Sequence, residues 1–214
     1  MSYDYDPELL PLLELLPDPG LDISDPVQSR LGFTEMIAAL NAELDQSGVA
    51  VEDREIPGPE GAPGVTVRIY RPEGLVGAGP GLLHIHGGGF VIGDLESEHG
   101  ACLALCRNLG IVVVSVDYRL APENPYPAGL DDCYAALQWV SANAGELQID
   151  AARLGIFGQS AGGGLSAATA LLARDRGGPA LCFQYLGIPE LDDRLETVSM
   201  REFVDTPMWH RPNA

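Results

Sequence analysis

A chain of 214 residues, 46% of them hydrophobic, is long enough to enclose one core, so a single domain is expected. Its 12 basic and 31 acidic residues give a formal net charge of −19, which argues against nucleic acid and against an anionic membrane surface as partners. We therefore expect a solvated, acidic surface.

The first twenty residues contain no basic segment of the kind that opens a secretory signal. Their leucines are interrupted by Pro11 and Glu14, which argues against a membrane span. We therefore expect a cytoplasmic protein without a membrane partner.

A helix is predicted to begin at Asp25-Pro26, because an aspartate followed by a proline is typical of an N-cap and a first helical turn. Apolar residues then recur at helical spacing as far as Leu44. We interpret residues 1–46 as a helical lid segment over one sheet edge, and residues 47–214 as the core.

The core alternates between strand and helix patterns. Ile111–Val116 is a continuous apolar run rich in β-branched residues, which is typical of a parallel strand covered on both faces. The order predicts an α/β protein with a mainly parallel sheet and helices on both faces. Strands are expected near 51–56 and 65–70, joined as a hairpin, and at 82–85, 111–116, 154–157 and 180–185; helices are expected before Gly110, at 130–143 and at 161–174.

Four cysteines lie in apolar stretches without C-x-x-C or Cys/His spacing. They are predicted to be buried free thiols rather than disulfides or zinc ligands. No metal or other cofactor is expected. The four are Cys102, Cys106, Cys133 and Cys182.

A G-x-S-x-G motif centred on Ser160 stands between a predicted strand and a predicted helix. In that context the sharp turn exposes the serine hydroxyl as a nucleophile. Gly158 and Gly162 are predicted at positions where a Cβ would collide with the crossing backbone. The alternative is an ordinary glycine-rich turn, so a second motif is needed.

That second motif is the loop His86–Phe90, which contains three consecutive glycines and directly follows a strand. Consecutive glycines let backbone N–H groups approach a substrate oxygen. His86 and Gly87 are predicted to support this loop. The predicted donors to an oxyanion are the N–H groups of Gly88, Gly89 and Ala161.

Two other interpretations of this loop are not favoured. Phosphate binding would call for G-x-G-x-x-G or a Walker lysine, and the loop has neither. His84 and His86 alternate onto one strand face, but no third metal ligand is near them in sequence. Both are therefore predicted to be structural.

Three ordered motifs, His86–Phe90, Asp117–Glu123 and the Ser160 turn, resemble those of the hormone-sensitive-lipase-like bacterial esterases. The resemblance implies an α/β-hydrolase fold and hydrolysis of small, short-chain carboxylic esters. It further implies a Ser-Asp-His triad without a cofactor, beneath an N-terminal lid. The proline-rich segment after Asp117 is interpreted as scaffold.

The resemblance also implies a catalytic acid and histidine on two further strand–helix units beyond Trp209–Pro212. Asp192, Asp193 or Asp205 with His210 is not favoured as a substitute, because no strand and helix fit between them. We therefore expect an incomplete chain with weak residual catalysis. We also expect an apolar edge at strand 180–185, where another copy or a missing C-terminal fragment would associate.

Two rival functions stay open. Plant gibberellin receptors resemble these esterases without catalysing hydrolysis, so a ligand-binding protein on the same fold is possible. Amidase or lactonase chemistry would use the same groups on a different leaving group. The retained serine and glycine loop favour the esterase.

Overall fold

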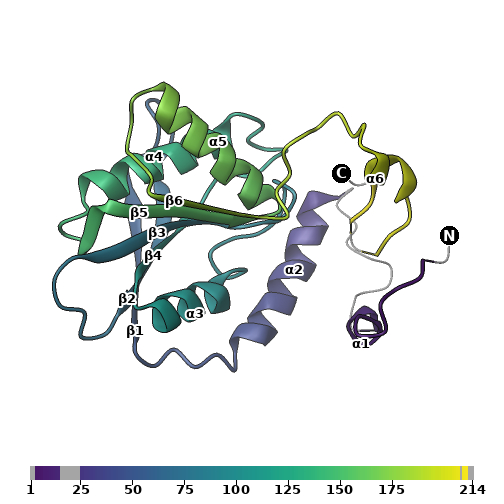
Figure 1. Cartoon of the computed structure of the whole chain (residues 1–214), viewed down its shortest axis with the longest axis horizontal. Helices are drawn as coiled ribbons and strands as arrows, with labels where there is room; N and C mark the ends of the chain where they lie inside the picture. The colour runs from purple at the N-terminus through teal and green to yellow at the C-terminus, as the bar shows by residue number, and fades with distance from the viewer. Residues whose placement is uncertain (1–2, 15–24, 208, 212–214) are drawn as a thin grey trace.

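The computed structural model describes residues 3–14, 25–207 and 209–211. Within these residues a six-stranded sheet has the order β1-β2-β4-β3-β5-β6 (Figure 1). The first two strands form the predicted antiparallel hairpin, β2 joins β4 antiparallel, and the last four positions are parallel. The strands are β1 (Val49–Ile56), β2 (Val65–Pro72), β3 (Gly79–Ile85), β4 (Val112–Asp117), β5 (Ile149–Gln159) and β6 (Phe183–Gly187).

Helices cover both faces of the sheet. Figure 1 shows α4 (Ala128–Ala142) and α5 (Ala161–Asp175) on one face and α3 (His99–Leu109) on the other. Gly110 ends α3 in the left-handed conformation, as a C-terminal glycine does. The predicted α/β class with a mainly parallel sheet is thus confirmed.

The centre of the core is β4. Its first five residues are all buried, which explains why this strand is an unbroken apolar run apart from Ser115. On either side of it lie two clusters of buried side chains, one beneath α4 and α5 and one beneath α3. Burial on both faces is the physical origin of the run seen in the sequence.

Two strand boundaries differ from the prediction. β5 begins at Ile149, because Ile149 pairs with Gly79 before a register shift brings Leu154 opposite Gly81. The strand expected at 180–185 is Phe183–Gly187, since its pairing with β5 starts at Gly155. Tertiary pairing, rather than local propensity, decides both boundaries.

The cysteine prediction is correct for Cys102, Cys106 and Cys133, which are buried and free. It is wrong for Cys182, which is free but exposed. Cys182 immediately precedes β6, the edge strand of the described sheet, which pairs only with β5. In an apolar run at the edge of a sheet, some side chains stay exposed because no further strand or helix covers them.

The segment predicted as a lid contains α1 (Leu10–Leu13) and α2 (Pro26–Asn41), and its residues 15–24 lie outside the described residues. Asp25 caps α2 as predicted, since its carboxylate accepts from the N–H groups of Val27 and Gln28 at 3.1 and 3.2 Å. Ile37 is the one buried residue recorded on α2. Polar contacts must therefore contribute much of its attachment.

Arg30 supplies four of these contacts from α2. Its guanidinium donates to the carbonyl oxygens of Val91 and Ala121, both at 2.7 Å. It also donates to the two carboxylate oxygens of Glu123, both at 2.8 Å. The Ala121 N–H in turn donates to the Phe90 carbonyl at 3.0 Å. One arginine therefore ties α2 to two loops, including the one that contains the glycine motif.

Replacing Arg30 by methionine is expected to lower the free energy of unfolding by about 2 kcal/mol, because two partly buried carbonyls lose their donor. Urea denaturation measures this change, and hydrogen exchange shows whether the amides of α2 lose protection. Arg194→Met is the matched control, since Arg194 is 72% exposed and pairs with nearby Asp192. Equal losses in the two variants would contradict the role assigned to Arg30.

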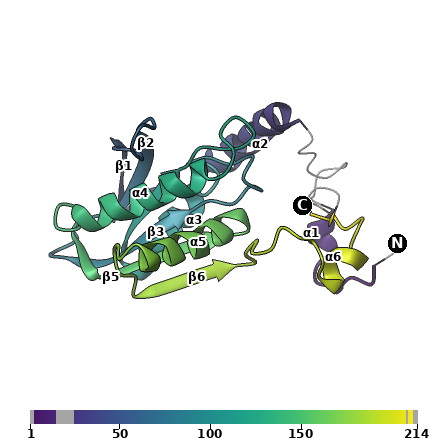
Figure 2. The ribbon, with the colours of Figure 1, turned by 90° about the horizontal axis from the view of Figure 1, so that it is seen from above.

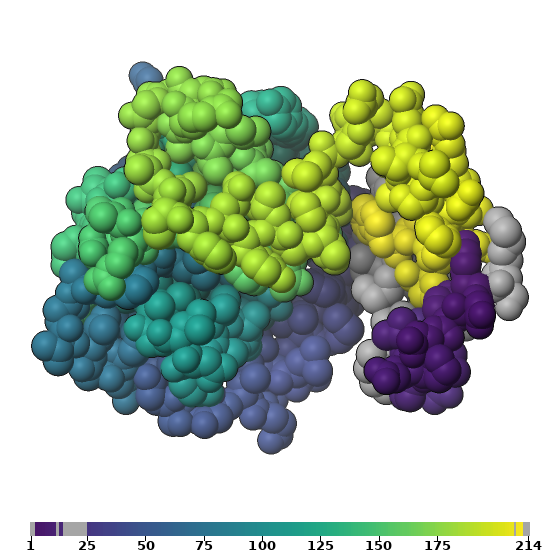
Figure 3. All heavy atoms as spheres, in the orientation of Figure 1, coloured from purple at the N-terminus to yellow at the C-terminus, as the bar shows by residue number. Residues whose placement is uncertain are grey.

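The two ends of the described chain lie together (Figures 2 and 3). The Tyr3 hydroxyl donates to Asp205, and the rings of Tyr3 and Phe203 lie 5.6 Å apart between centroids. Phe203 directly follows α6 (Val198–Glu202), so the N-terminal segment packs on the segment after β6. The N-terminal segment thus contacts parts of the chain that are distant in sequence.

In the described sheet β6 is an edge strand with apolar side chains in solvent. Phe183 is 56% exposed and Tyr185 is 46% exposed, although the Tyr185 ring stacks on Phe157 at 4.6 Å. Unpaired strand edges of this kind associate with other strands. The edge predicted from the sequence is present.

We expect the 214-residue chain to associate through β6 as its concentration rises, and Phe183→Lys to reduce that association by placing a charge at the edge. Size-exclusion chromatography with light scattering measures the mass. Leu109→Lys is the control, because Leu109 is 61% exposed on α3, which packs on β1, β2 and β4 rather than beside β6. A chain that stays monomeric at every concentration would contradict the expectation.

Candidate active site

Ser160 occupies the sharp turn between β5 and α5, as predicted. Its backbone has φ 54° and ψ −125°, a region that residues with a Cβ rarely adopt. Its N–H donates to the Gly187 carbonyl at 2.9 Å, which ties the turn to the end of β6. The strained backbone is therefore held from a neighbouring strand.

The glycines on either side of Ser160 permit a close crossing of backbones. A Cβ on Gly162 would lie 2.1 Å from the Ile85 carbonyl oxygen, and one on Gly158 would lie 2.1 Å from the Gly162 carbonyl oxygen. Neither overlap can be relieved by a side-chain rotation, because both partners are backbone atoms. The predicted collisions are present, and Gly162 meets β3 itself.

The glycine loop after β3 runs beside Ser160. A Cβ on Gly87 would lie 3.6 Å from the Cβ of Ser160. Gly88 has φ 122° and Gly89 has φ 56°, and the Gly88 carbonyl accepts from the N–H groups of residues 91 and 92. Side chains rarely adopt such φ values, so the sequence needs glycine at both positions.

Ala161 is the first residue of α5. Backbone N–H groups in the first turn of a helix have no acceptor within the helix, and they carry the positive end of its dipole. The N–H of Ala161 and the Gly88–Gly89 loop therefore flank the turn that carries the Ser160 hydroxyl. This arrangement can stabilise a developing negative charge.

His86 is fully buried and supports the glycine loop. Its ring stacks on Tyr118 at 4.2 Å, and its Nδ1 donates to the Gly87 carbonyl at 2.7 Å. The Tyr118 hydroxyl donates to the His86 carbonyl at 3.1 Å. Burial lowers the pKa of His86 to about 4, so its ring is neutral at pH 7. These contacts agree with a structural histidine.

The second histidine of β3 is also buried. His84 stacks on Phe157 at 5.2 Å, and burial lowers its pKa to about 3. In the described part of the chain, no three His, Cys, Asp or Glu side chains are arranged to hold a metal ion. Nor is any helix in that part long and apolar enough to cross a membrane.

Glu190 is a site residue that the motifs did not indicate. The Ser160 hydroxyl donates to its carboxylate at 2.9 Å, and the Glu190 N–H donates to the Ser160 carbonyl at 3.2 Å. Burial raises the pKa of this half-buried carboxyl. The sequence did contain a signal for Glu190. Ser160 follows β5 and Glu190 comes soon after β6, and parallel strands bring the residues after their carboxyl ends to the same edge of the sheet.

Two of the acidic residues considered as triad members have contacts elsewhere. Asp192 is paired with Arg194 at 2.7 Å, and Asp205 accepts from Tyr3. Trp209 lies next to the glycine loop, since a Cβ added to Gly89 would be 3.0 Å from the Trp209 ring. The segment near residue 209 therefore covers the glycine loop with an aromatic ring.

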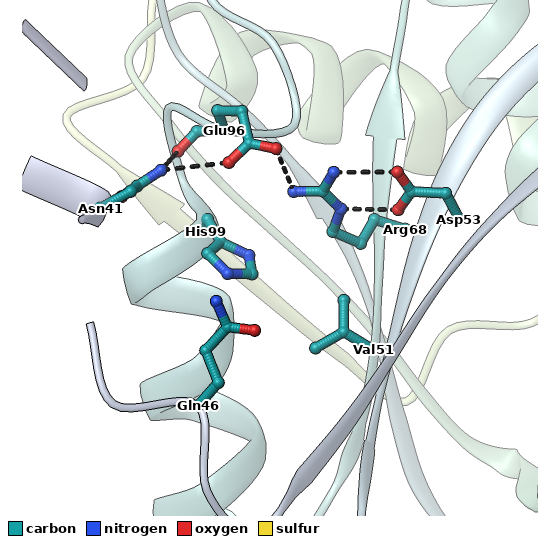
Figure 4. A pocket seen from close by; sticks show the side chains of 7 residues that line it. All are labelled: Asn41, Gln46, Val51, Asp53, Arg68, Glu96 and His99. Carbon is teal, nitrogen blue, oxygen red and sulfur yellow. Dashed lines mark hydrogen bonds and ion pairs between the residues drawn. The ribbon is translucent and has the colours of Figure 1, made fainter. Parts of the chain in front are cut away.

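A separate cavity of about 430 Å³ lies between α3, the end of α2 and the first two strands (Figure 4). Its charged groups are paired, since Arg68 donates to both Asp53 and Glu96, and the three together carry one formal negative charge. None of the predicted site residues lines it, so it is distinct from the Ser160 site. The lining residues are Asn41, Gln46, Val51, Asp53, Arg68, Glu96 and His99.

A strained serine between a parallel strand and a helix, flanked by a glycine loop that can bind an oxyanion, defines the serine hydrolases of the α/β-hydrolase type. Comparison with known proteins agrees. The family model described as alpha/beta hydrolase fold matches residues 82–214. The chain belongs to this family, among the hormone-sensitive-lipase-like esterases that its motifs resemble.

Individual relatives are similar over nearly the whole chain. Carboxylesterase NlhH of Mycobacterium tuberculosis is 40% identical over 210 residues, which cover 97% of this chain and 64% of the relative. A solved structure, bacterial heroin esterase, is 50% identical with a TM-score of 0.94 and covers 97% and 65% of the two chains. A thermostable esterase from Pseudomonas putida ECU1011 is 32% identical with a TM-score of 0.88, covering 100% and 66%. The chain thus spans about two thirds of the length of these relatives.

Proposed function

We propose that the protein hydrolyses small carboxylic esters with short acyl chains through a covalent intermediate on Ser160. The observation that carries the proposal is the Ser160 turn, which lies beside the Gly87–Gly89 loop. The names of the relatives, a carboxylesterase and a heroin esterase, support the same chemistry. No cofactor is needed for acyl transfer of this kind.

In the proposed first step the Ser160 oxygen attacks the ester carbonyl and forms a tetrahedral intermediate. The N–H groups of Gly88, Gly89 and Ala161 donate to its oxyanion. Loss of one such donor costs about 3 kcal/mol of transition-state stabilisation, or roughly a hundredfold in rate. His86 and Gly158 act indirectly, by holding the loop and the turn in place.

We further propose that residues 1–46 act as a lid. Arg30 supports this role, because it connects α2 to the loop that carries the oxyanion donors. Through that contact, movement of α2 would change the opening above Ser160. Such a lid would select substrates by size.

Labelling with a fluorophosphonate, followed by mass spectrometry of the adduct, tests the proposed function in the 214-residue chain. The expected result is one adduct, on Ser160. A panel of p-nitrophenyl esters from acetate to laurate, with matched amides and lactones, then defines the leaving group and acyl length. An unlabelled Ser160 in a folded chain would contradict the proposal and would favour a non-catalytic ligand-binding protein.

A further inference from the structure

We propose that Glu96 is a positioning residue, which fixes the glycine loop and its oxyanion donors to the end of α2 and to β2. This role deepens the proposed function and rests on it. Glu96 lies in the linking segment, residues 91–98, which leads from the glycine loop to α3. Its side chain contacts α2 and the sheet, and its backbone belongs to a turn that packs against the glycine loop.

The Glu96 side chain joins two elements. Its Oε1 accepts from Arg68 Nη1 of β2 at 2.7 Å, and its Oε2 accepts from Asn41 Nδ2 at the end of α2 at 3.2 Å. The Asn41 amide also donates to the Glu96 carbonyl at 2.9 Å. Figure 4 shows these side chains, together with Asp53, as one continuous row of hydrogen bonds along the cavity wall.

Arg68 is held in place from its other side. Its Nε and Nη2 donate to the two carboxylate oxygens of Asp53 at 2.6 and 2.9 Å, in the bidentate geometry that favours arginine. The Arg68 side chain is 13% exposed, so solvent screens its ion pairs less than those of a surface arginine. The hydrogen bond from Arg68 lowers the pKa of Asp53, which therefore stays charged at neutral pH. Glu96 thus binds a fixed charge on the sheet.

The linking segment carries this attachment to the glycine loop. The Asp94 Oδ1 accepts from the N–H groups of Glu96 and Ser97 at 3.0 and 2.9 Å, so Glu96 belongs to a closed turn. Gly93 leads into that turn with φ 98°, and a Cβ there would lie 2.7 Å from the Gly87 carbonyl oxygen. The turn is therefore packed against the start of the glycine loop.

The helix α2 contacts the linking segment at two places. Arg30, near the start of α2, donates to the Val91 carbonyl at 2.7 Å, and Asn41, its last residue, donates to Glu96. These two contacts lie about 16 Å apart along the helix axis. Because a helix of this length is stiff, it fixes both ends of the linking segment and limits movement of the glycine loop.

The donors on the glycine loop depend on this alignment. A displacement of about 1 Å at a reacting centre can cost roughly a hundredfold in rate, even when its origin is remote. Loss of the Glu96 contacts should therefore slow acylation of Ser160 and leave the affinity for the acylating reagent unchanged. A residue that only stabilises the fold would change neither quantity in a chain that is still folded.

The test compares fluorophosphonate labelling of the 214-residue chain and its Glu96→Ala variant over a range of reagent concentrations. This series separates the maximal labelling rate from the concentration that gives half of it. We expect the maximal rate to fall about tenfold, part of the hundredfold that loss of a whole donor costs, and the half-saturating concentration to stay the same. Hydrogen exchange should also become faster at the amides of residues 87–98.

Glu146→Ala is the matched control. Glu146 is 61% exposed and pairs with Arg54 at 2.6 Å beside Trp139 of α4, so this variant also loses an arginine ion pair and should label like the parent. Glu96→Gln keeps an acceptor for Asn41 and Arg68 and should recover part of the rate. Urea denaturation confirms that every variant is folded.

Three results would overturn the role of Glu96 while the proposed function stands. They are an unchanged maximal rate in Glu96→Ala, a change confined to the half-saturating concentration, and equal losses of rate in Glu96→Ala and Glu146→Ala. A parent chain without a Ser160 adduct overturns both the role of Glu96 and the proposed function.

Discussion

Replacing Ser160 by alanine is expected to abolish the fluorophosphonate adduct and to lower ester hydrolysis to the level that the oxyanion donors and substrate binding alone supply. The substitution removes the attacking oxygen but keeps the Cβ, so it adds no strain to the backbone at φ 54°. The hydrogen bond to Glu190 is the recorded side-chain contact that is lost. Intact-protein mass spectrometry and initial rates on a short-chain p-nitrophenyl ester measure the two effects.

Ser166→Ala is the control for this prediction. Ser166 lies on the same helix and is buried, so its loss tests whether removing any serine hydroxyl near the turn disturbs the site. We expect the Ser166 variant to label at the rate of the parent chain. An adduct that persists in Ser160→Ala would show that another residue is the nucleophile.

Replacing Gly88 by alanine is expected to slow acylation at least about a hundredfold, because the donors on the glycine loop are displaced. The new Cβ would lie 2.1 Å from the Ile92 carbonyl oxygen, and φ 122° is rarely adopted by alanine. The N–H groups of Val91 and Ile92 both donate to the Gly88 carbonyl. Gly88 therefore cannot move away from Ile92 without breaking these two hydrogen bonds. A stability loss of about 1–3 kcal/mol should accompany the slower rate.

Gly77→Ala separates the two causes of that loss. Gly77 has φ 75°, and no heavy atom lies within 4 Å of the Cβ that alanine would add. The control therefore carries the conformational cost without the collision and without a place in the site. Labelling kinetics measure the acylation rate of both variants, and urea denaturation measures their stability. Equal labelling rates in the two variants would contradict an oxyanion role for the loop.

Local pattern was sufficient for the Ser160 turn. The glycines at 158 and 162, the preceding strand and the following helix are all within about one turn or strand of the serine, so their spacing carries the geometry. The partners of those glycines are a different matter. Gly162 meets the carbonyl of Ile85 on β3, and only the parallel pairing of β3 with β5 brings these residues together.

The N-terminal segment shows where periodicity reaches its limit. Helical spacing and the Asp25 cap correctly predicted α2, but its apolar residues Leu31 and Leu40 are 57% and 63% exposed. Attachment instead involves Arg30, a residue that no periodic pattern singles out. Its partners are carbonyls and a carboxylate from loops 61 to 93 residues away.

The sequence by itself therefore determined the fold class, the Ser160 turn and the glycine loop, because each shows in a pattern of residues close together in the chain. Only the tertiary structure decided that Glu190 faces Ser160, 30 residues away, and that Cys182 is exposed. Both outcomes follow from β6, whose register with β5 pairs Gln159 with Gly187 and whose other side is a sheet edge. Strand order and register are set by long-range pairing, which residue spacing along one strand does not specify.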